Sequence, residues 1–530
     1  MKKFWILIVL GVVAGCSLTS QDLRSGGVLK PEQANMDVLF YSIALDVDFI
    51  NNSINGHAVV TFDFEDTAEG ILLDLWHGLQ VRKVEVNHLD VSFEHTKDDL
   101  LKIGYDITFP AGKYEVKVHY GGKPAKAENP PWKGGFQWEK DSRGNHWMAI
   151  TCQGEGGKIY FPCKDHPSDK PDLGAELIIT VPEDLVVAGP GMIESHTIEN
   201  GKATWHWKTH YPISNYSIVF NVGKYVLAER DYETRNGNKV PMHFYILEEN
   251  IQKADKHLTL LERSLGVLEK YFGEYPFADE KVGIVETPHL GMEHQTMNAY
   301  GNKFRYQTIG EVDFDWLMHH ELGHEWWGNK VFNRDWAHMW IQEGICSFGD
   351  ALFTLEYAGQ EAYNRQMRMT ARNVKNQLPI IPGEVADSDE VYQPDIYGKG
   401  AFFMHTLKYI LGNELFFRIL LDFIHEPAYT YIHPVDTDDV EQYFSLRSGQ
   451  NLKPIFDFYL KTTKWLEIEI RQNEKGAYEA RLANFDGVLP MEFETDKGVI
   501  KTKLGQDWET IPSSIYPVAD PEGYYLKKVK

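Results

Sequence analysis

The spacing of hydrophobic and polar residues changes twice along the chain, and the first region alternates with a period of two. Segments such as YSIALDVDF and GHAVVTFDF place apolar residues near every second position, and turn sequences such as NNSING separate them. The pattern continues in ELIITVP, ATWHWKT and YSIVFNVG. Successive side chains of a strand point to opposite faces, so this alternation is typical of half-buried strands. We predict an N-terminal β domain over residues 37–225, built as a sandwich or saddle of sheets.

Helical spacing replaces the alternation near residue 250. Apolar residues there follow the 3-4-3-4 spacing of an amphipathic helix: Leu258, Leu261, Leu265, Leu268 and Phe272. Gly273 and Pro276 supply the stop signal that commonly follows such a helix. Alternation returns after about residue 464 in WLEIEIRQ, YEARLANF and LPMEFET. We therefore predict a multidomain α+β protein, with a mostly helical domain over residues 226–463 and a small β domain over residues 464–530.

The composition is that of a globular protein, and its charge argues against one class of partner. The chain has 530 residues, of which 43% are hydrophobic. The formal charge is −24, from 53 basic and 77 acidic residues. A surface with this acidic balance repels phosphate groups, so we expect no nucleic acid partner. The composition does not fix the oligomeric state.

The N-terminal stretch MKKFWILIVLGVVAGC resembles an export signal. Two lysines precede an apolar run that is too short for a permanent membrane span. Its end, VAGC, resembles the lipobox of bacterial lipoproteins, which implies removal of residues 1–15 and lipidation of Cys16. Ser17 is compatible with the outer membrane, so we expect an exported lipoprotein held on a membrane by its N-terminal lipid. The alternative is an ordinary signal peptide or a chance cysteine.

We predict that residues 16–36, which are polar and contain Gly and Pro, form a flexible tether. The cysteines after this segment are Cys152, Cys163 and Cys346, too few for a disulfide framework in a chain of this size. A single bridge between Cys152 and Cys163 remains open. Folding must therefore rest on buried apolar surface.

The stretch DWLMHHELGHEWWGN carries the strongest chemical signal in the chain. His320 and His324 are four residues apart, and residues i and i+4 lie on one face of a helix. Two imidazoles there can bind one zinc ion, and Glu321 between them is placed to activate a water molecule. His319 has no partner at this spacing, because residue 323 is Gly. The alternative is a partly exposed helix with hydrogen-bonded histidines.

The sequence also indicates where this helix begins and ends, and where a third zinc ligand lies. Asp315 can cap its start, and the Gly and Asn at residues 328–329 signal its end. Eighteen residues separate His324 from Glu343, which lies among apolar residues in WIQEGICSF. An unpaired carboxylate is costly to bury, and binding to a metal would offset that cost. A solvent-facing Glu343 is the alternative, but the joint pattern HExxH-x18-E favours one zinc ion per chain.

Taken together, these motifs resemble the family of zinc aminopeptidases that includes aminopeptidase N and leukotriene hydrolase. The family's HExxHxWxGN and WLNEG motifs correspond to HELGHEWWGN and WIQEG, and TCQGEGGKIYFPCKDHPSDK resembles its FPCxDxP region. The resemblance covers nearly the whole chain after the signal. It implies a thermolysin-like fold for residues 226–463 and peptides with a free N-terminus as substrates. It also implies specific roles: zinc ligands His320, His324 and Glu343, with Glu321 as general base.

The segment LGMEH at residues 290–294 stands where the family has GxMEN. The resemblance implies that Glu293 binds the α-ammonium group of the substrate, with Gly291 and Met292 beside the substrate backbone. A carboxylate fixed at this distance from the metal would admit only the first peptide bond. Gln153 falls where a family glutamine lines the same amino-terminal subsite.

The segment IYGKGAF resembles the family's YEKGA stretch. It implies that Tyr397 donates a hydrogen bond to the oxyanion, a role that suits a neutral phenol. Tyr392 is a competitor for this role, although the GKGA sequence does not follow it. The sequence contains no clear signal for the residues that contact the second ring nitrogens of His320 and His324. Asp387 and Asp389 are candidates from position alone.

Departures from the family pattern bear on specificity more than on chemistry. Leu290 replaces a Gly, His294 replaces an Asn, and Gln342 precedes Glu343 where Asn is commoner. Two other functions remain open from the sequence. One is a different zinc hydrolase, either an endopeptidase or a bifunctional enzyme, and the other is a non-enzymatic surface lipoprotein.

Overall fold

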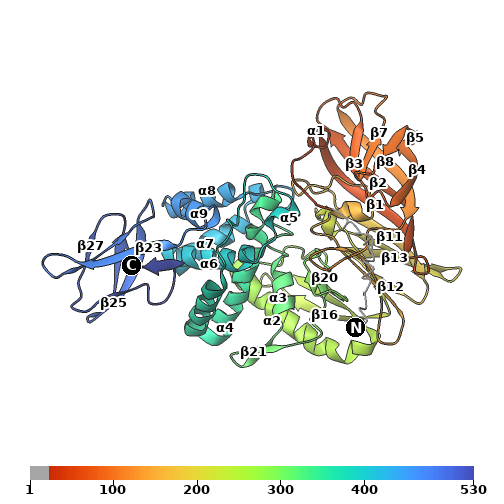
Figure 1. The fold of residues 1–530 in the computed structure, drawn as a ribbon. Coiled ribbons are helices and arrows are strands. Elements are labelled where there is room, and N and C mark those ends of the chain that lie inside the picture. The colour runs from red at the N-terminus through yellow and green to blue at the C-terminus, as the bar shows by residue number, and fades with distance from the viewer. Residues whose placement is uncertain (1–22) are drawn as a thin grey trace, which may run out of the picture.

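The computed structural model describes residues 23–530, with β-sheets at both ends of the molecule and helices between them (Figure 1). The mixed α+β fold class expected from the sequence is confirmed. The predicted signal peptide and Cys16 lie outside the described residues and stay predictions. Within the described range, no helix is both long enough and apolar enough to cross a membrane.

The largest sheet of the N-terminal region has eight strands in the order β13-β14-β11-β1-β2-β8-β4-β5. Its bounds are β1 (Met36–Asp48), β2 (Ser53–Phe64), β4 (Leu79–Val86), β5 (Leu89–Asp90), β8 (Gly112–Gly122), β11 (Ala175–Pro182), β13 (Met192–Glu199) and β14 (Lys202–Lys208). The alternation in the sequence becomes burial: in β1 the apolar set Tyr41, Ile43, Leu45 and Val47 is buried, and the residues between are only partly covered. One face of the sheet therefore supplies core, as a period of two predicts.

Two smaller sheets complete this region. One has four strands, β9 (Gly135–Lys140), β10 (His146–Thr151), β12 (Val186–Ala188) and β15 (Asn221–Gly223). The other has three, β3 (Ile71–Asp74), β6 (Phe93–His95) and β7 (Leu100–Ile103). Cys152 and Cys163 are buried here as free thiols, so the open possibility of a bridge between them is not realised.

The central region combines a five-stranded sheet with the main helices. The strand order is β16-β17-β18-β20-β19, with bounds β16 (Tyr225–Glu233), β17 (Lys239–Leu247), β18 (Val282–Glu286), β19 (Gly291–Met292) and β20 (Asn298–Tyr300). The two-residue strand β19 lies at the edge, so one side of its backbone is free to pair. The predicted amphipathic helix is α2 (Ala254–Phe272), and the five apolar residues from which it was predicted are all buried.

Two helices that carry site residues touch at a pair of glycines. Helix α4 (Trp340–Asn373) contacts α6 (Pro394–Leu411), and a Cβ on Gly344 would lie 2.8 Å from the Cα of Gly400. No other residue type permits this separation of the two backbones. The glycines of WIQEG and GKGA therefore set how closely Glu343 on α4 approaches Tyr397 on α6.

Helix α3 (Trp316–Gly323) begins where the sequence predicts. Asp315 is its N-cap, and the Asp315 side chain accepts a hydrogen bond from the backbone N–H of Met318 at 3.3 Å. The helix ends at Gly323 and not near Gly328 as predicted. Tighter turns follow, in which the backbone N–H groups of Trp326 and Trp327 both donate to the oxygen of Gly323. His324 keeps helical dihedral angles as the C-cap, so the i, i+4 relation to His320 is retained.

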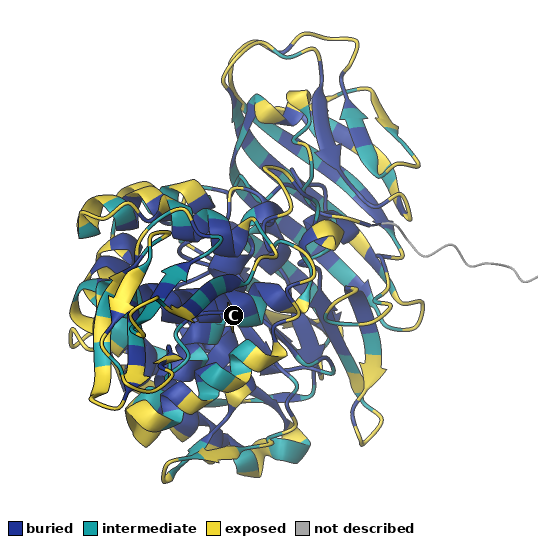
Figure 2. Ribbon diagram, turned by 60° about the vertical axis from the view of Figure 1, so that its left-hand side comes forward, coloured by how far each residue is buried: buried dark blue, intermediate teal, exposed yellow. Residues whose placement is uncertain are grey.

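The remaining elements complete the helical region and the C-terminal end. They are the helices α5 (Ser388–Val391), α7 (Asn413–Ile424), α8 (Thr437–Ser448) and α9 (Lys453–Leu460), and the hairpin of β21 (Gln307–Ile309) and β22 (Val312–Phe314). The C-terminal strands are β23 (Leu466–Gln472), β24 (Tyr478–Leu482), β25 (Leu489–Thr495), β26 (Gly498–Leu504), β27 (Glu509–Ile511), β28 (Val518–Ala519) and β29 (Lys527–Val529). They form a four-stranded and a three-stranded sheet. Burial is densest in the central region, and the C-terminal sheets carry exposed outer edges (Figure 2).

An amino-terminal strap, residues 23–27, lies between the N-terminal sheets and the helices. Backbone hydrogen bonds tie it to both: Ser25 N to Gly154 O (2.9 Å), Gly27 N to Ala386 O (3.2 Å) and Ser388 N to Ser25 O (3.1 Å). The Ser25 hydroxyl also donates to Asp165 at 3.0 Å, and Leu23 is buried. A short helix, α1 (Pro31–Ala34), follows. The prediction of a flexible tether over residues 16–36 is therefore wrong for residues 23–36.

The two glycines of the strap allow a matched test of this packing. Both have positive φ, +79° for Gly26 and +78° for Gly27, but only Gly26 touches a neighbour closely. A Cβ on Gly26 would lie 2.4 Å from Trp336 Cδ1, whereas the nearest atom to one on Gly27 is 3.8 Å away. Gly26→Ala should lower the free energy of unfolding by about 3 kcal/mol, and Gly27→Ala, which adds only backbone strain, by about 1 kcal/mol. Scanning calorimetry of the two variants checks this, and equal losses would contradict the buried contact with Trp336.

Candidate active site

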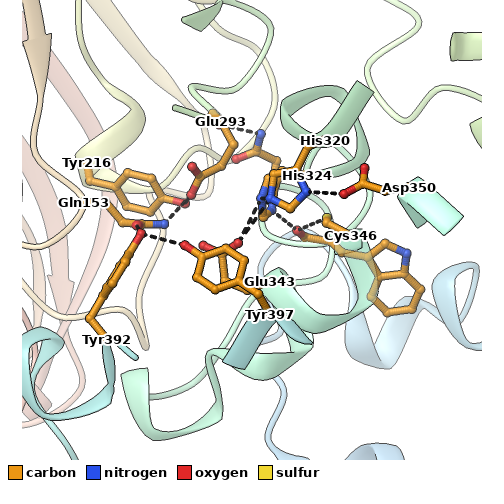
Figure 3. Close-up of polar contacts among 12 residues, drawn as sticks. Gln153, Tyr216, Glu293, His320, His324, Glu343, Cys346, Asp350, Tyr392 and Tyr397 are labelled. Carbon is orange, nitrogen blue, oxygen red and sulfur yellow. Dashed lines mark hydrogen bonds and ion pairs between the residues drawn. The ribbon is translucent and has the colours of Figure 1, made fainter. Parts of the chain in front are cut away.

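Three side-chain atoms form a triangle at the junction of α3 and α4. His320 Nε2 and His324 Nε2 are 3.3 Å apart, and each lies 3.4 Å from Glu343 Oε2. All three residues are buried and point toward one another (Figure 3). Zinc ligands at about 2.0–2.1 Å in tetrahedral geometry are separated by about 3.3–3.4 Å, so the donor set fits this ion. The triangle leaves the fourth position of the tetrahedron to water or substrate.

The second nitrogen of each imidazole has a partner that fixes the ring. His320 Nδ1 lies 3.1 Å from Asp350 Oδ2, and His324 Nδ1 lies 2.9 Å from the backbone oxygen of Trp327. The Cys346 thiol donates to that same Trp327 oxygen at 3.6 Å. Such contacts orient metal-binding imidazoles and leave Nε2 free for the ion.

Neither aspartate proposed for this role from sequence position contacts a histidine. Asp387 is the N-cap of α5, where its side chain and that of Glu390 form a capping box, and it pairs with Arg24 of the strap at 3.1 Å. Asp389 lies 3.6 Å from the same arginine. Asp350 was missed, although it follows Glu343 by seven residues, two helical turns along the same face of α4.

Glu321 points into the same cavity and lies against strand β19. A Cβ on Gly291 would lie 2.4 Å from Glu321 Oε1 and 2.7 Å from Leu317 Cδ1, so the strand backbone lies directly against the carboxylate. Burial raises the pKa of Glu321, and the neighbouring imidazoles of His320 and His324 oppose this rise. The carboxylate is therefore held close to the triangle without joining it.

Glu293 is held by residues of the N-terminal region. Its Oε1 accepts hydrogen bonds from Gln153 Nε2 and from the hydroxyl of Tyr216, the latter at 2.8 Å (Figure 3). Burial raises the pKa of the Glu293 carboxyl, and the nearby His324 opposes this. Tyr216 could not be identified from the sequence, because the pattern of YSIVFNVG is typical of a strand and no local signal marks the tyrosine hydroxyl.

A chain of hydrogen bonds links the two ends of the site. The hydroxyl of Tyr397 donates to the hydroxyl of Tyr392 at 3.0 Å, and Tyr392 donates to Gln153 Oε1 at 3.4 Å. Gln153 in turn donates to Glu293. Burial raises the pKa of both tyrosines well above the usual value, so each remains a protonated donor. Both candidates for the oxyanion role thus lie in the site, with Tyr392 already hydrogen-bonded to Gln153.

Glu325, directly after His324, joins the end of α3 to the segment that carries Glu293. Its fully buried carboxylate accepts hydrogen bonds from Thr296 N (2.9 Å), Asn298 Nδ2 (2.8 Å) and Asn329 Nδ2 (3.2 Å). Asn329 Nδ2 also donates to the backbone oxygen of Glu293 at 2.9 Å. This link fixes the distance from the metal ligands to Glu293. From the sequence, Asn329 was interpreted only as a helix end signal, and Glu325 was missed.

These groups surround one cavity of about 170 Å³. Every predicted metal, catalytic and substrate residue lines it except Gln153, which reaches it through Glu293 and Tyr392. The apolar residues Pro131, Trp132, Leu290, Trp316 and Leu317 complete its walls. His319 lies outside it, with its Nε2 3.3 Å from the backbone oxygen of Gly349.

Comparison with known proteins places both large regions in one family. Residues 258–459 match the peptidase family M1 domain, and residues 38–217 match the peptidase M1 N-terminal domain. Aminopeptidase N of Escherichia coli (strain K12) is 26% identical over 290 residues, 51% of this chain and 33% of that protein. Leucyl aminopeptidase of Saccharolobus solfataricus is 21% identical over 507 residues, 89% of this chain and 60% of that protein. The chain thus spans a third to three-fifths of the length of these two relatives.

Solved structures share the fold. The M1 zinc metallopeptidase from Deinococcus radiodurans superimposes with a TM-score of 0.68 at 20% identity, covering 83% of this chain and 96% of that one. A mutant of that protein bound to a Tyr-Ser-Ala substrate gives a TM-score of 0.67 at 21% identity, covering 82% of this chain and 95% of that one. The two matched domains, the HExxH-x18-E ligands and the shared fold agree, and the chain belongs to the M1 family of peptidases.

Proposed function

We propose that this protein is a zinc-dependent aminopeptidase that hydrolyses the first peptide bond of peptides with a free N-terminus. The observation that carries the proposal is the position of Glu293. One oxygen of Glu293, one oxygen of Glu321 and one nitrogen of His324 lie within 4.8 Å of one another. An ammonium group paired with Glu293 leaves room for only its own residue before the metal, so the first carbonyl is the one that can react.

The rest of the cavity also supports binding of the substrate with its N-terminus at Glu293. Gln153 and Tyr216 close the end of the cavity behind Glu293, so a chain that continued past the ammonium position would meet buried side chains. The free edge of β19 can pair with the substrate backbone as an added strand. An endopeptidase would need an open path at the Glu293 end, and a non-enzymatic binder would not need the complete ligand set.

In the proposed mechanism His320, His324 and Glu343 hold the zinc ion. A zinc ion held there would act as a Lewis acid, which would polarise the scissile carbonyl and lower the pKa of the attacking water. Glu321 takes a proton from that water and delivers it to the leaving amine. The Tyr397 hydroxyl turns from Tyr392 to donate to the oxyanion, while Tyr392 stays with Gln153. Glu293 neutralises the substrate ammonium and holds it in register.

The general-base role of Glu321 can be separated from metal binding by one substitution. Glu321→Gln keeps the size of the side chain but removes its ability to accept a proton. We expect kcat to fall by about 100- to 10,000-fold, with zinc content still near one equivalent per chain. Hydrolysis of leucine aminomethylcoumarin and metal analysis of the same preparation check this. A variant that retains a tenth or more of the activity would contradict the mechanism.

The role of Glu293 predicts a strict need for a free N-terminus. Wild-type protein should cleave a peptide such as Leu-Ala-Phe from its first residue and leave the N-acetylated peptide intact. Glu293→Gln should raise KM by about tenfold to a hundredfold, since a hydrogen bond to a charged group is lost. Tyr216→Phe, which removes one neutral donor to Glu293, should raise KM by about threefold to tenfold. Chromatographic analysis of the products decides, and cleavage of the acetylated peptide within its chain would favour an endopeptidase.

Because Asp350 contacts His320, we predict that substitution of Asp350 weakens metal binding, whereas substitution of Asp387 does not. Asp350→Ala should weaken zinc binding by about 10- to 100-fold, because the imidazole loses the partner that orients it. Asp387→Ala is the matched control, since it removes the N-cap of α5 and an ion pair with Arg24 but no contact to a metal ligand. Competition with a chelator of known affinity measures both variants. Equal affinities for Asp350→Ala and wild type would remove Asp350 from the metal site.

A further inference from the structure

Two tryptophans on the walls of the cavity indicate which kind of substrate side chain the site accepts. Trp132 and Trp316, 54% and 37% exposed, are the most exposed tryptophans among the described residues, and both line this cavity. The other tryptophans of residues 23–530 are buried or partly buried. Large aromatic side chains left in water beside a binding cavity are typical contact surfaces for an apolar group.

Trp132 stands on a loop that is fixed before any substrate arrives. Backbone hydrogen bonds close the loop between Asn129 and Lys133, at 2.9 and 3.1 Å, and Gly134 N donates to the buried Glu155 at 2.7 Å. A Cβ on Gly134 would lie 2.2 Å from the backbone oxygen of Thr151, so the loop lies directly on strand β10. The backbone that carries the indole is therefore preformed, and little backbone ordering entropy is lost when a side chain packs on this wall.

The wall lies at the ammonium end of the substrate. The backbone oxygen of Trp132 is 4.0 Å from the position that a Cβ on Gly154 would take, and Gly154 follows Gln153, which contacts Glu293. A residue whose ammonium is held by Glu293 thus directs its side chain to the region of Trp132. Trp316 stands on a different element, because it begins α3, the helix of Glu321, next to Leu317 and β19.

The charges around the cavity narrow the choice of side chain. Among the described residues that line the cavity there is no lysine or arginine, and the carboxylates among them are Glu293, Glu321 and Glu343. An acidic side chain would add a negative charge where the ion and the ammonium are already paired with carboxylates. A basic side chain would find each carboxylate already engaged with the ammonium, the reacting water or the metal. The apolar walls of the cavity therefore suit an uncharged side chain.

We propose that Trp132 selects peptides whose first residue has a large apolar side chain, such as Leu or Phe, an inference that rests on the aminopeptidase function proposed above. Side chains of this kind cover the indole and displace water from it, and the methyl group of Ala is too short to do so. Differences of this size in an apolar pocket are worth about tenfold or more in kcat/KM.

The test uses the zinc-loaded protein and aminomethylcoumarin amides of Leu, Phe, Ala, Lys and Glu, which share one leaving group. For wild type, kcat/KM should be about tenfold higher for Leu and Phe than for Ala, and lowest for Glu. Trp132→Ala should reduce kcat/KM for Leu and Phe by about tenfold and leave the Ala substrate within twofold. Trp132→Phe should keep most of the wild-type preference in kcat/KM for the Leu and Phe substrates over the Ala substrate. Lys133→Ala, on the same loop but outside the lining, should behave as wild type.

Each outcome bears on one proposal. If wild type hydrolyses none of the five substrates, or does so equally well with a chelator present, the aminopeptidase function itself is wrong. If it hydrolyses them in a chelator-sensitive way but prefers Lys or shows no preference, only the role of Trp132 is wrong. Trp132→Ala that lowers kcat/KM equally for all five substrates would also overturn selection, and would leave the residue a general support of the site.

Discussion

Three buried carboxylates share one small cavity, and the surrounding structure serves to offset their mutual repulsion. Glu293, Glu321 and Glu343 are each less than a tenth exposed, and all three line the same walls. Unpaired carboxylates at this depth would take up protons or destabilise the fold. A divalent ion bound by the triangle would supply compensating positive charge, and in the proposed function the ammonium of a substrate would supply more, whereas the two imidazoles bind the ion as neutral ligands. In the proposed function the ion offsets the charge of Glu343 and the ammonium offsets that of Glu293.

Much of the metal site could be predicted from the sequence, because its residues follow the spacing of helical turns and short motifs. His320 and His324 are related by one helical turn, and the glycines of WIQEG and GKGA let α4 and α6 meet, so that Glu343 and Tyr397 reach the same cavity. Asp350 could also have been found, since it lies two turns after Glu343 on one face. The assignment of Asp387 failed although a local signal was present, because the sequence DSDE is a capping box that already occupies this carboxylate.

Tyr216, Glu325 and the strap could not be predicted, because their roles depend on contacts between distant segments. The Tyr216 hydroxyl meets a carboxylate 77 residues away, and the strap bonds to residues more than 120 positions further along. The strap also shows why composition misled. A Ser-Gly-Gly sequence is typical of a flexible linker, but the same residues suit a chain that must take positive φ beside an indole. Burial decides between the two readings, and burial is a property of the whole fold.

In the function proposed above, recognition of an N-terminus depends on both large regions together. The helical region supplies the metal ligands, Glu321 and Glu293, but Gln153 and Tyr216 of the N-terminal region hold the Glu293 carboxylate in place. The strap continues this connection, because Ser25 donates to the oxygen of Gly154, the residue after Gln153. A shift between the regions would leave the zinc triangle intact and move the partners of Glu293. In the proposed function hydrolysis thus depends on α3, α4 and Tyr397 of α6, whereas the choice of the first peptide bond depends on how the two regions are packed against each other.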